Sequence, residues 1–151
     1  MPDAKSPSGA LGVMQLMPAT AKIVAKNLGL SYDSNTSLIR PDLNIRLGTH
    51  YLGQMLRKFD NNRILASAAY NAGPGRVNQW LDPSIPFDVW IEIIPFTETR
   101  NYVQNVLTFS SIYSRRMDEE QPLLYPHERN YFSPRRISTI QPKPKKLPEN
   151  S

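Results

Sequence analysis

The stretch AYNAGPGRV, residues 69–77, constrains this chain most strongly, because it dictates where a helix must stop. Alanine favours helix through residues 66–69. The two glycines of the run Gly73-Pro74-Gly75 permit backbone angles that other residues rarely adopt. Because the proline lacks a backbone N–H donor, we expect the helix to end there. The pattern therefore predicts Tyr70 and Asn71 at a helix C-terminus beside an open loop. That position suits ligand contact, although an ordinary helix cap with a packed tyrosine fits the same letters.

Apolar residues elsewhere recur at helical intervals. Between residues 42 and 59 they fall three and four apart and predict a long helix with one broad buried face, with Asp42 as its cap. The run Asp60-Asn61-Asn62 is placed to cap the alanine-rich helix, and Thr97 to cap a later one. No segment predicts a strand, so we expect a mainly α fold with little or no sheet. The predicted helical segments are 10–17, 19–28, 42–59, the alanine-rich run to 72, 76–81, 87–94 and 97–116.

Composition limits the function classes. The chain has 151 residues, 40% of them hydrophobic, which is ordinary for one globular domain. No apolar run approaches the ~20 residues of a membrane span. Cysteine is absent, which excludes disulfides and thiolate metal sites, and neither His50 nor His127 has a second ligand at metal spacing, so we predict no metal and no cofactor. The net charge of +5 favours an acidic partner: nucleic acid, an anionic membrane surface or a polyanionic cell-wall polymer.

The C-terminal part differs in composition from the rest. Prolines recur from residue 122 onward, and residues 142–146 form a basic, proline-rich tract. We therefore expect a domain over residues 1–116, an extension over residues 117–133 packed on or near it, and a disordered basic tail over residues 134–151.

Four segments together resemble the soluble lytic murein transglycosylase family, specifically its C-terminal catalytic domain. They are SPSGA at residues 6–10, GVMQLMP at 12–18, AYNAGPGRV at 69–77 and IPFTETR at 94–100. Their order and spacing match the family over residues 1–113, although each segment alone is a weak signal. The resemblance implies a lysozyme-like, goose-type helical fold and a place in the periplasm or cell envelope of a bacterium.

The resemblance also implies a reaction. Members cleave the β-1,4 bond between N-acetylmuramic acid and N-acetylglucosamine in peptidoglycan glycan strands and leave a 1,6-anhydro sugar. One glutamate donates a proton to the glycosidic oxygen and then, as carboxylate, takes the proton of the C6 hydroxyl. The family pattern places that glutamate a few residues before an Asn-Pro, and Met1 stands where the asparagine would be. We therefore expect the general acid/base glutamate upstream of Met1, and little or no activity from these 151 residues.

The remaining site residues follow one at a time from the resemblance. Tyr70 matches the tyrosine beside the catalytic carboxylate, and Glu98 matches a second glutamate of the sugar cleft; the helix macrodipole would equally favour an acid at Glu98. The substrate-binding candidates are Ser6, Gln15, Met17, Tyr70, Asn71 and Glu98. Ser6 and Asn71 also suit turns, and Met17 also suits a core. Glu92 is the rival carboxylate, and its helical spacing predicts a solvated position.

Other interpretations of the same residues stay open. Trp80, Trp90 and Tyr102 could stack on sugar rings, although large aromatics more often fill cores. The chain could be a non-catalytic peptidoglycan-binding or partner-binding module that uses the same groove. Nucleic-acid binding is disfavoured, because basic and aromatic residues are not interleaved as single-strand readers require.

Overall fold

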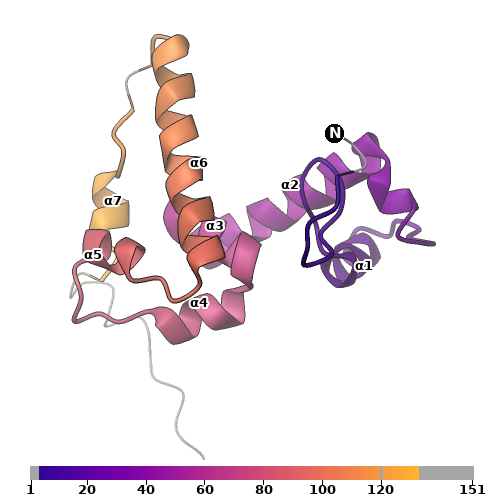
Figure 1. Ribbon diagram of the computed structural model, residues 1–151, viewed down its shortest axis with the longest axis horizontal. Helices are drawn as coiled ribbons and strands as arrows, with labels where there is room; N and C mark the ends of the chain where they lie inside the picture. The colour runs from indigo at the N-terminus through magenta and orange to yellow at the C-terminus, as the bar shows by residue number, and fades with distance from the viewer. Residues whose placement is uncertain (1–3, 120, 133–151) are drawn as a thin grey trace, which may run out of the picture. The chain divides into compact units, whose positions relative to one another are not determined.

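The computed structural model describes residues 4–119 and 121–132 and divides into two compact units, Met1–Val77 and Asn78–Ser151 (Figure 1). Within the described residues no strand forms, and β pairing is limited to isolated bridges of Leu11 with Lys5 and with Leu16. The mainly α fold is confirmed. The helices are α1 (Pro18–Asn27), the 3₁₀ turn η1 (Ser37–Ile39), α2 (Pro41–Lys58), α3 (Arg63–Ala72), α4 (Pro74–Trp80), α5 (Phe87–Glu92), α6 (Thr97–Arg116) and α7 (Pro126–Arg129).

Several helix ends follow local chemistry. Asn62 caps α3, since its side-chain oxygen accepts hydrogen bonds from the amides of Ile64 and Leu65 at 3.1 and 3.0 Å, as predicted. Helix α3 stops at Gly73, which has φ of 92°. The predicted caps Asp42 and Thr97 are wrong: α2 and α6 begin after Arg40 and Phe96, and neither N-cap side chain makes a capping hydrogen bond. Proline at the first position of α2 fixes the helical φ without a side-chain cap.

The predicted helix over residues 10–17 is also wrong. Gly12 and Gln15 both have positive φ, 76° and 48°, and a right-handed helix cannot contain such residues. Leu11 and Leu16 instead exchange two backbone hydrogen bonds of 3.0 Å across a tight turn. Residues 4–17 therefore form a loop that folds on itself; we call it the site loop.

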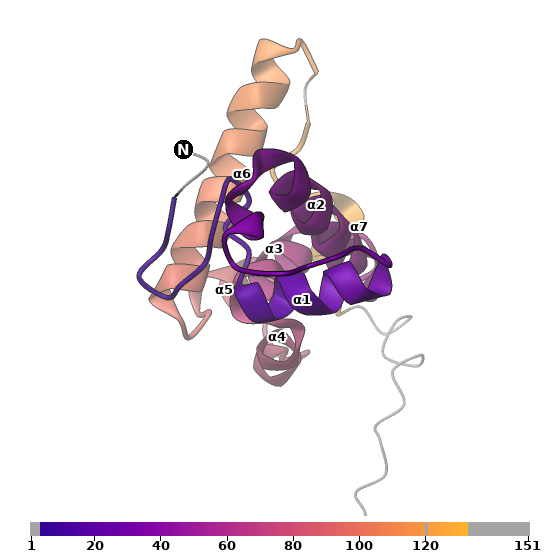
Figure 2. The ribbon, with the colours of Figure 1, turned by 90° about the vertical axis from the view of Figure 1, so that its right-hand side faces the viewer.

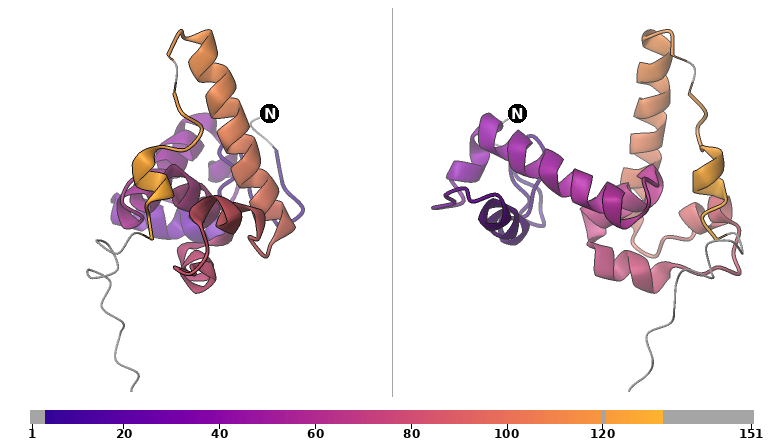
Figure 3. Two further views of the ribbon diagram at one scale, coloured as in Figure 1. Left: turned by 90° about the vertical axis from the view of Figure 1, so that its left-hand side faces the viewer. Right: turned by 180° about the vertical axis from the view of Figure 1, so that it is seen from behind.

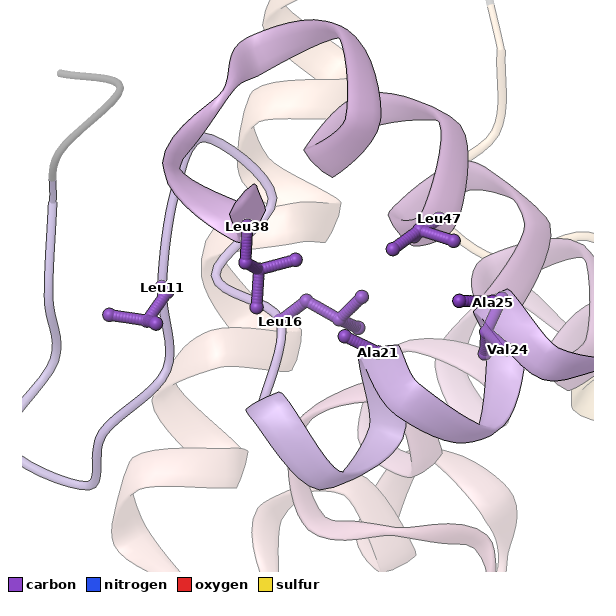
Figure 4. Packing of buried hydrophobic residues seen from close by; sticks show 7 residues of the cluster. All are labelled: Leu11, Leu16, Ala21, Val24, Ala25, Leu38 and Leu47. Carbon is purple, nitrogen blue, oxygen red and sulfur yellow. The ribbon is translucent and has the colours of Figure 1, made fainter. Parts of the chain in front are cut away.

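The first unit has its core between the site loop, α1, η1 and α2. Figure 2 shows these elements facing the viewer, and Figure 4 shows the side chains that meet there. Leu16, Val24, Leu38 and Leu47 are almost wholly buried. Full burial of a leucine stabilises a fold by roughly 1.5–3 kcal/mol, so Leu11 and Leu16 anchor the site loop to the helices. The whole cluster comprises Leu11, Leu16, Ala21, Val24, Ala25, Leu38 and Leu47.

The second unit is built on aromatic packing. Trp90 of α5 is buried, stacks on Phe87 at 5.7 Å between ring centroids and donates its indole N–H to the carbonyl of Trp80 at 2.7 Å. Trp90 is thus a core residue, and Trp80 is half-buried. After α6 the chain returns so that α7 lies beside α5, and Tyr131 and Phe132 pack on Phe87 (Figures 1 and 3).

The predicted C-terminal segments are only partly described by the structure. The predicted tail, residues 134–151, lies outside the described residues, as do residues 120 and 133 of the predicted extension. In the described part of the chain, no helix combines the length and the apolar character needed to cross a bilayer.

Candidate active site

The site loop is held by one buried amide, that of Asn44 in α2. Its oxygen accepts the amide hydrogen of Met14 at 2.7 Å, and its nitrogen donates to the carbonyls of Leu11 and Leu38 at 2.9 and 3.0 Å. The side chain is fully buried, so water cannot replace these bonds without an opening of the core. Asn44 thereby fixes both the turn of the loop and the 3₁₀ segment that precedes α2.

Gly48, one turn after Asn44, lets the loop approach α2 closely. A Cβ at this position would stand 2.6 Å from the Met14 Cβ and 3.1 Å from the Tyr70 hydroxyl oxygen. Only glycine therefore allows Met14 and Tyr70 to meet over this part of α2.

Tyr70 bonds directly to the loop. Its hydroxyl donates to the Met14 carbonyl at 2.9 Å, and its ring lies 5.4 Å from the ring of Tyr51, tilted by 48°. Burial raises the pKa of the Tyr51 phenol above its ordinary 10.0. Asn71 follows at the end of α3 and is half-buried. The alanine-rich helix thus brings Tyr70 to the site loop across 56 residues of sequence.

Gln15 occupies the outer corner of the same turn. Its side-chain nitrogen donates to the carbonyls of Gly12 and Ala4 at 2.9 and 3.2 Å, while the residue as a whole is exposed. Within residues 4–119 and 121–132 no donor reaches its side-chain oxygen. That oxygen is available to accept a hydrogen bond from a ligand hydroxyl.

The other loop candidates have different surroundings. Met17 is 41% exposed, which rules out the core role that its residue type also suited. Ser6 accepts the amide hydrogen of Ala10 at 2.9 Å through its hydroxyl, and its own amide donates to the Ala10 carbonyl at 2.9 Å. Ser6 therefore closes the outer turn of the site loop, as a turn serine does.

The two candidate carboxylates belong to the second unit. Glu98 is exposed in the first turn of α6, where the helix macrodipole favours negative charge. Glu92 is exposed as well and accepts hydrogen bonds from the Gln104 amide at 3.2 and 3.3 Å. Its solvated position was predicted. Among the described residues, no group of three His, Asp or Glu side chains is placed to hold a metal ion.

The loop and helix segments brought together here are those of a known enzyme family. The sequence pattern of the transglycosylase SLT domain matches residues 1–87, which is more than half of the chain. This chain belongs to the transglycosylase SLT domain family. A second pattern, that of the soluble lytic transglycosylase helical domain, matches residues 93–122.

Relatives of this SLT domain are larger proteins. The soluble lytic murein transglycosylase of Salmonella typhimurium is 46% identical over 127 residues, which are 82% of this chain and 20% of that protein. Lytic transglycosylase Slt from Pseudomonas aeruginosa, solved as an inactive glutamate-to-glutamine mutant, is 56% identical with a TM-score of 0.76, over 85% of this chain and 21% of that one. The 70-kDa soluble lytic transglycosylase in complex with bulgecin A is 44% identical with a TM-score of 0.79, over 84% and 21%. The chain thus spans about a fifth of these relatives.

Two residues of the SLT domain's site were missed by the sequence analysis. Asn44 and Gly48 lie on the predicted buried face of α2, where the pattern otherwise favours apolar side chains. A polar amide and a glycine at core positions of an amphipathic helix were the available signal, because a buried amide must have partners and a buried glycine implies close approach.

Proposed function

We propose that this chain is the catalytic domain of a lytic murein transglycosylase, which cleaves the β-1,4 bond between N-acetylmuramic acid and N-acetylglucosamine and forms a 1,6-anhydro sugar in the bacterial cell envelope. The family membership and the names of the relatives support this proposal. The observation that carries it is the hydrogen bond from Tyr70 to the Met14 carbonyl, because it joins two separate family segments into one surface.

Each candidate residue has a role in this proposal. Gln15 offers a carbonyl oxygen to a sugar hydroxyl, and the exposed Met17 offers an apolar edge to a sugar ring. Ser6 closes the outer turn of the site loop. Asn71, next to Tyr70 at the end of α3, is a further residue proposed to contact the sugar, and Glu98 of α6 is the one that the family resemblance assigns to the sugar cleft.

Tyr70 has a defined hydrogen-bonding polarity that bears on acid catalysis. A phenol has a single hydrogen, and Tyr70 gives it to the Met14 carbonyl. By the family resemblance a catalytic carboxyl stands beside this tyrosine. A carboxyl that donated a hydrogen bond to the phenol oxygen would be stabilised in its neutral form, which suits a proton donor to the glycosidic oxygen.

By the family resemblance we place the acid before Met1, outside residues 1–151. In the Pseudomonas aeruginosa relative, the mutant in which glutamine replaces one glutamate is inactive. We therefore propose that the 151-residue polypeptide has weak activity or none. The second candidate function, which the same candidate sugar-binding residues would serve, is a non-catalytic peptidoglycan-binding module.

The test is digestion of purified murein sacculi, with mass spectrometry of the released fragments. We expect negligible 1,6-anhydro product from the 151-residue chain, and product from the chain extended at its N-terminus by a helix carrying the family's glutamate and Asn-Pro. Efficient release by the unextended chain would refute the assignment of the acid. No release by a folded, extended chain that still sediments with sacculi would favour the binding module.

A further inference from the structure

The face of α2 opposite the site loop carries a hollow lined by cationic side chains. Asn44, Gly48 and Met55 share the loop-facing side of the helix, and a rotation of 100° per residue puts positions 46, 50, 53 and 57 on the other side. The hollow encloses about 330 Å³, near the lower limit of small-molecule sites. Its lining residues are Leu28, Arg46, Thr49, His50, Gly53 and Arg57.

Among the described residues, no carboxylate lines this hollow. In residues 4–119 and 121–132, the ion pair joins Arg40 to Asp42 at 2.9 Å, near the start of α2 and outside the lining of this hollow. Neither Arg46 nor Arg57 has a carboxylate within salt-bridge distance in that part of the chain. Two guanidinium groups and an imidazole therefore face one space that the described chain does not neutralise. An anion in the hollow would supply the opposite charge that the described lining residues do not.

The glycine in this stripe opens the space. Gly53 has no side chain to fill the position between His50 and Arg57, and the Arg57 Nη1 lies 3.4 Å from where a Cβ would stand. The guanidinium of Arg57 thus lies back over the glycine. Thr49 uses its hydroxyl hydrogen on the backbone of its own helix, at 2.7 Å from the Ile45 carbonyl, so the charged side chains supply the donors.

The spacing of the donors indicates what kind of anion fits. The Arg57 guanidinium lies over Gly53, which is seven residues and about 10 Å along the helix axis from Arg46, with His50 between them. A ligand with two oxyanion groups can contact both guanidinium groups at once. Arg46 also borders a neighbouring hollow of about 300 Å³, but Asp42 lines that hollow together with Arg40, so the anion site is confined to the first one. Guanidinium groups bind carboxylate and phosphate oxygens in the same two-pronged manner.

We propose that the hollow lined by Arg46, His50 and Arg57 is a binding site for a ligand that carries two or more oxyanion groups, carboxylates or phosphates. The site is separate from the proposed sugar-binding surface and does not depend on the proposed reaction. The ordinary alternative is a solvated basic helix face that attracts anions only through net charge, and the experiment is designed to distinguish the two.

The test is a titration of the full 151-residue chain, labelled with ¹⁵N, followed by NMR. Pimelate is the dicarboxylate probe, tripolyphosphate is the phosphate probe and acetate is the single-charge comparison. We expect shift changes centred on residues 46–57, with at least about tenfold tighter binding of a multivalent probe than of acetate. Arg46→Gln and Arg57→Gln should each weaken that probe about tenfold, corresponding to the loss of one charge-assisted contact.

Lys58→Gln is the matched control, since Lys58 is an exposed cation at the same helix end but does not line the hollow. It should change the affinity less than twofold. Preference for pimelate assigns carboxylates as the ligand groups, and preference for tripolyphosphate assigns phosphates. Absence of saturable shifts up to about 10 mM probe, or equal weakening by Lys58→Gln and Arg57→Gln in folded variants, would overturn the proposal.

Discussion

Two glycines of α2 should respond in opposite ways to the same substitution. Alanine is a better helix former than glycine by about 1 kcal/mol, so Gly→Ala in a helix stabilises wherever the methyl group has room. At Gly53 the nearest atom is the mobile end of Arg57 at 3.4 Å, and we expect Gly53→Ala to raise the free energy of unfolding by about 0.5–1 kcal/mol. At Gly48 the methyl group would stand 2.6 Å from the Met14 Cβ, well inside van der Waals contact.

The strain at Gly48 outweighs the helix propensity. Overpacking costs about 1–3 kcal/mol, and displacement of Met14 also threatens its hydrogen bonds with Asn44 and Tyr70. We therefore expect Gly48→Ala to lower the free energy of unfolding by about 1–3 kcal/mol. Urea unfolding followed by far-UV circular dichroism measures both variants. If Gly48→Ala stabilised the protein as much as Gly53→Ala does, the close approach of the site loop to α2 would be refuted.

Three further variants test the surroundings of the site. Asn44→Ala removes three hydrogen bonds, leaves the Met14 amide and the Leu38 carbonyl without this partner and opens a buried space, so it should cost about 2–4 kcal/mol in urea unfolding; a cost below about 1 kcal/mol would contradict the role of Asn44 in holding the site loop. Tyr70→Phe in the glutamate-extended chain should reduce murein turnover at least about tenfold with the fold intact, and unchanged turnover would remove Tyr70 from the mechanism. Because burial raises the pKa of Tyr51, its phenol contributes stability that is complete below its unfolded pKa of about 10 and is lost as pH rises through the folded pKa. Tyr51→Phe should lessen this alkaline loss of stability, and an unchanged loss in urea unfolding at high pH would contradict the burial of the phenol.

Elements with a local cause were predictable from sequence. Asn62 caps α3 and Gly73 ends it because the responsible side chain, or its absence, lies within the segment itself. The stripe of apolar residues that gave the buried face of α2 is equally local.

The site loop could not be predicted in the same way. The apolar residues of the loop are compatible with a helix. Its conformation is instead set by hydrogen bonds to the side-chain amide of Asn44, which lies about thirty residues away in sequence. The positive φ of Gln15 belongs to that arrangement and has no signature in its own residue type. The contact of Tyr70 with Met14 was anticipated only as a shared surface implied by the family resemblance, without the bond itself.

We propose that the site loop and the end of α3 form one sugar-binding surface. This can be tested by NMR titration of the ¹⁵N-labelled 151-residue chain with a soluble oligomer of alternating N-acetylglucosamine and N-acetylmuramic acid. We expect saturable shifts at Gln15, Met17, Tyr70 and Asn71, and binding weakened about tenfold by Gln15→Ala in a folded protein. Saturable binding that leaves these four residues unshifted, or no binding at all by the folded chain, would contradict it.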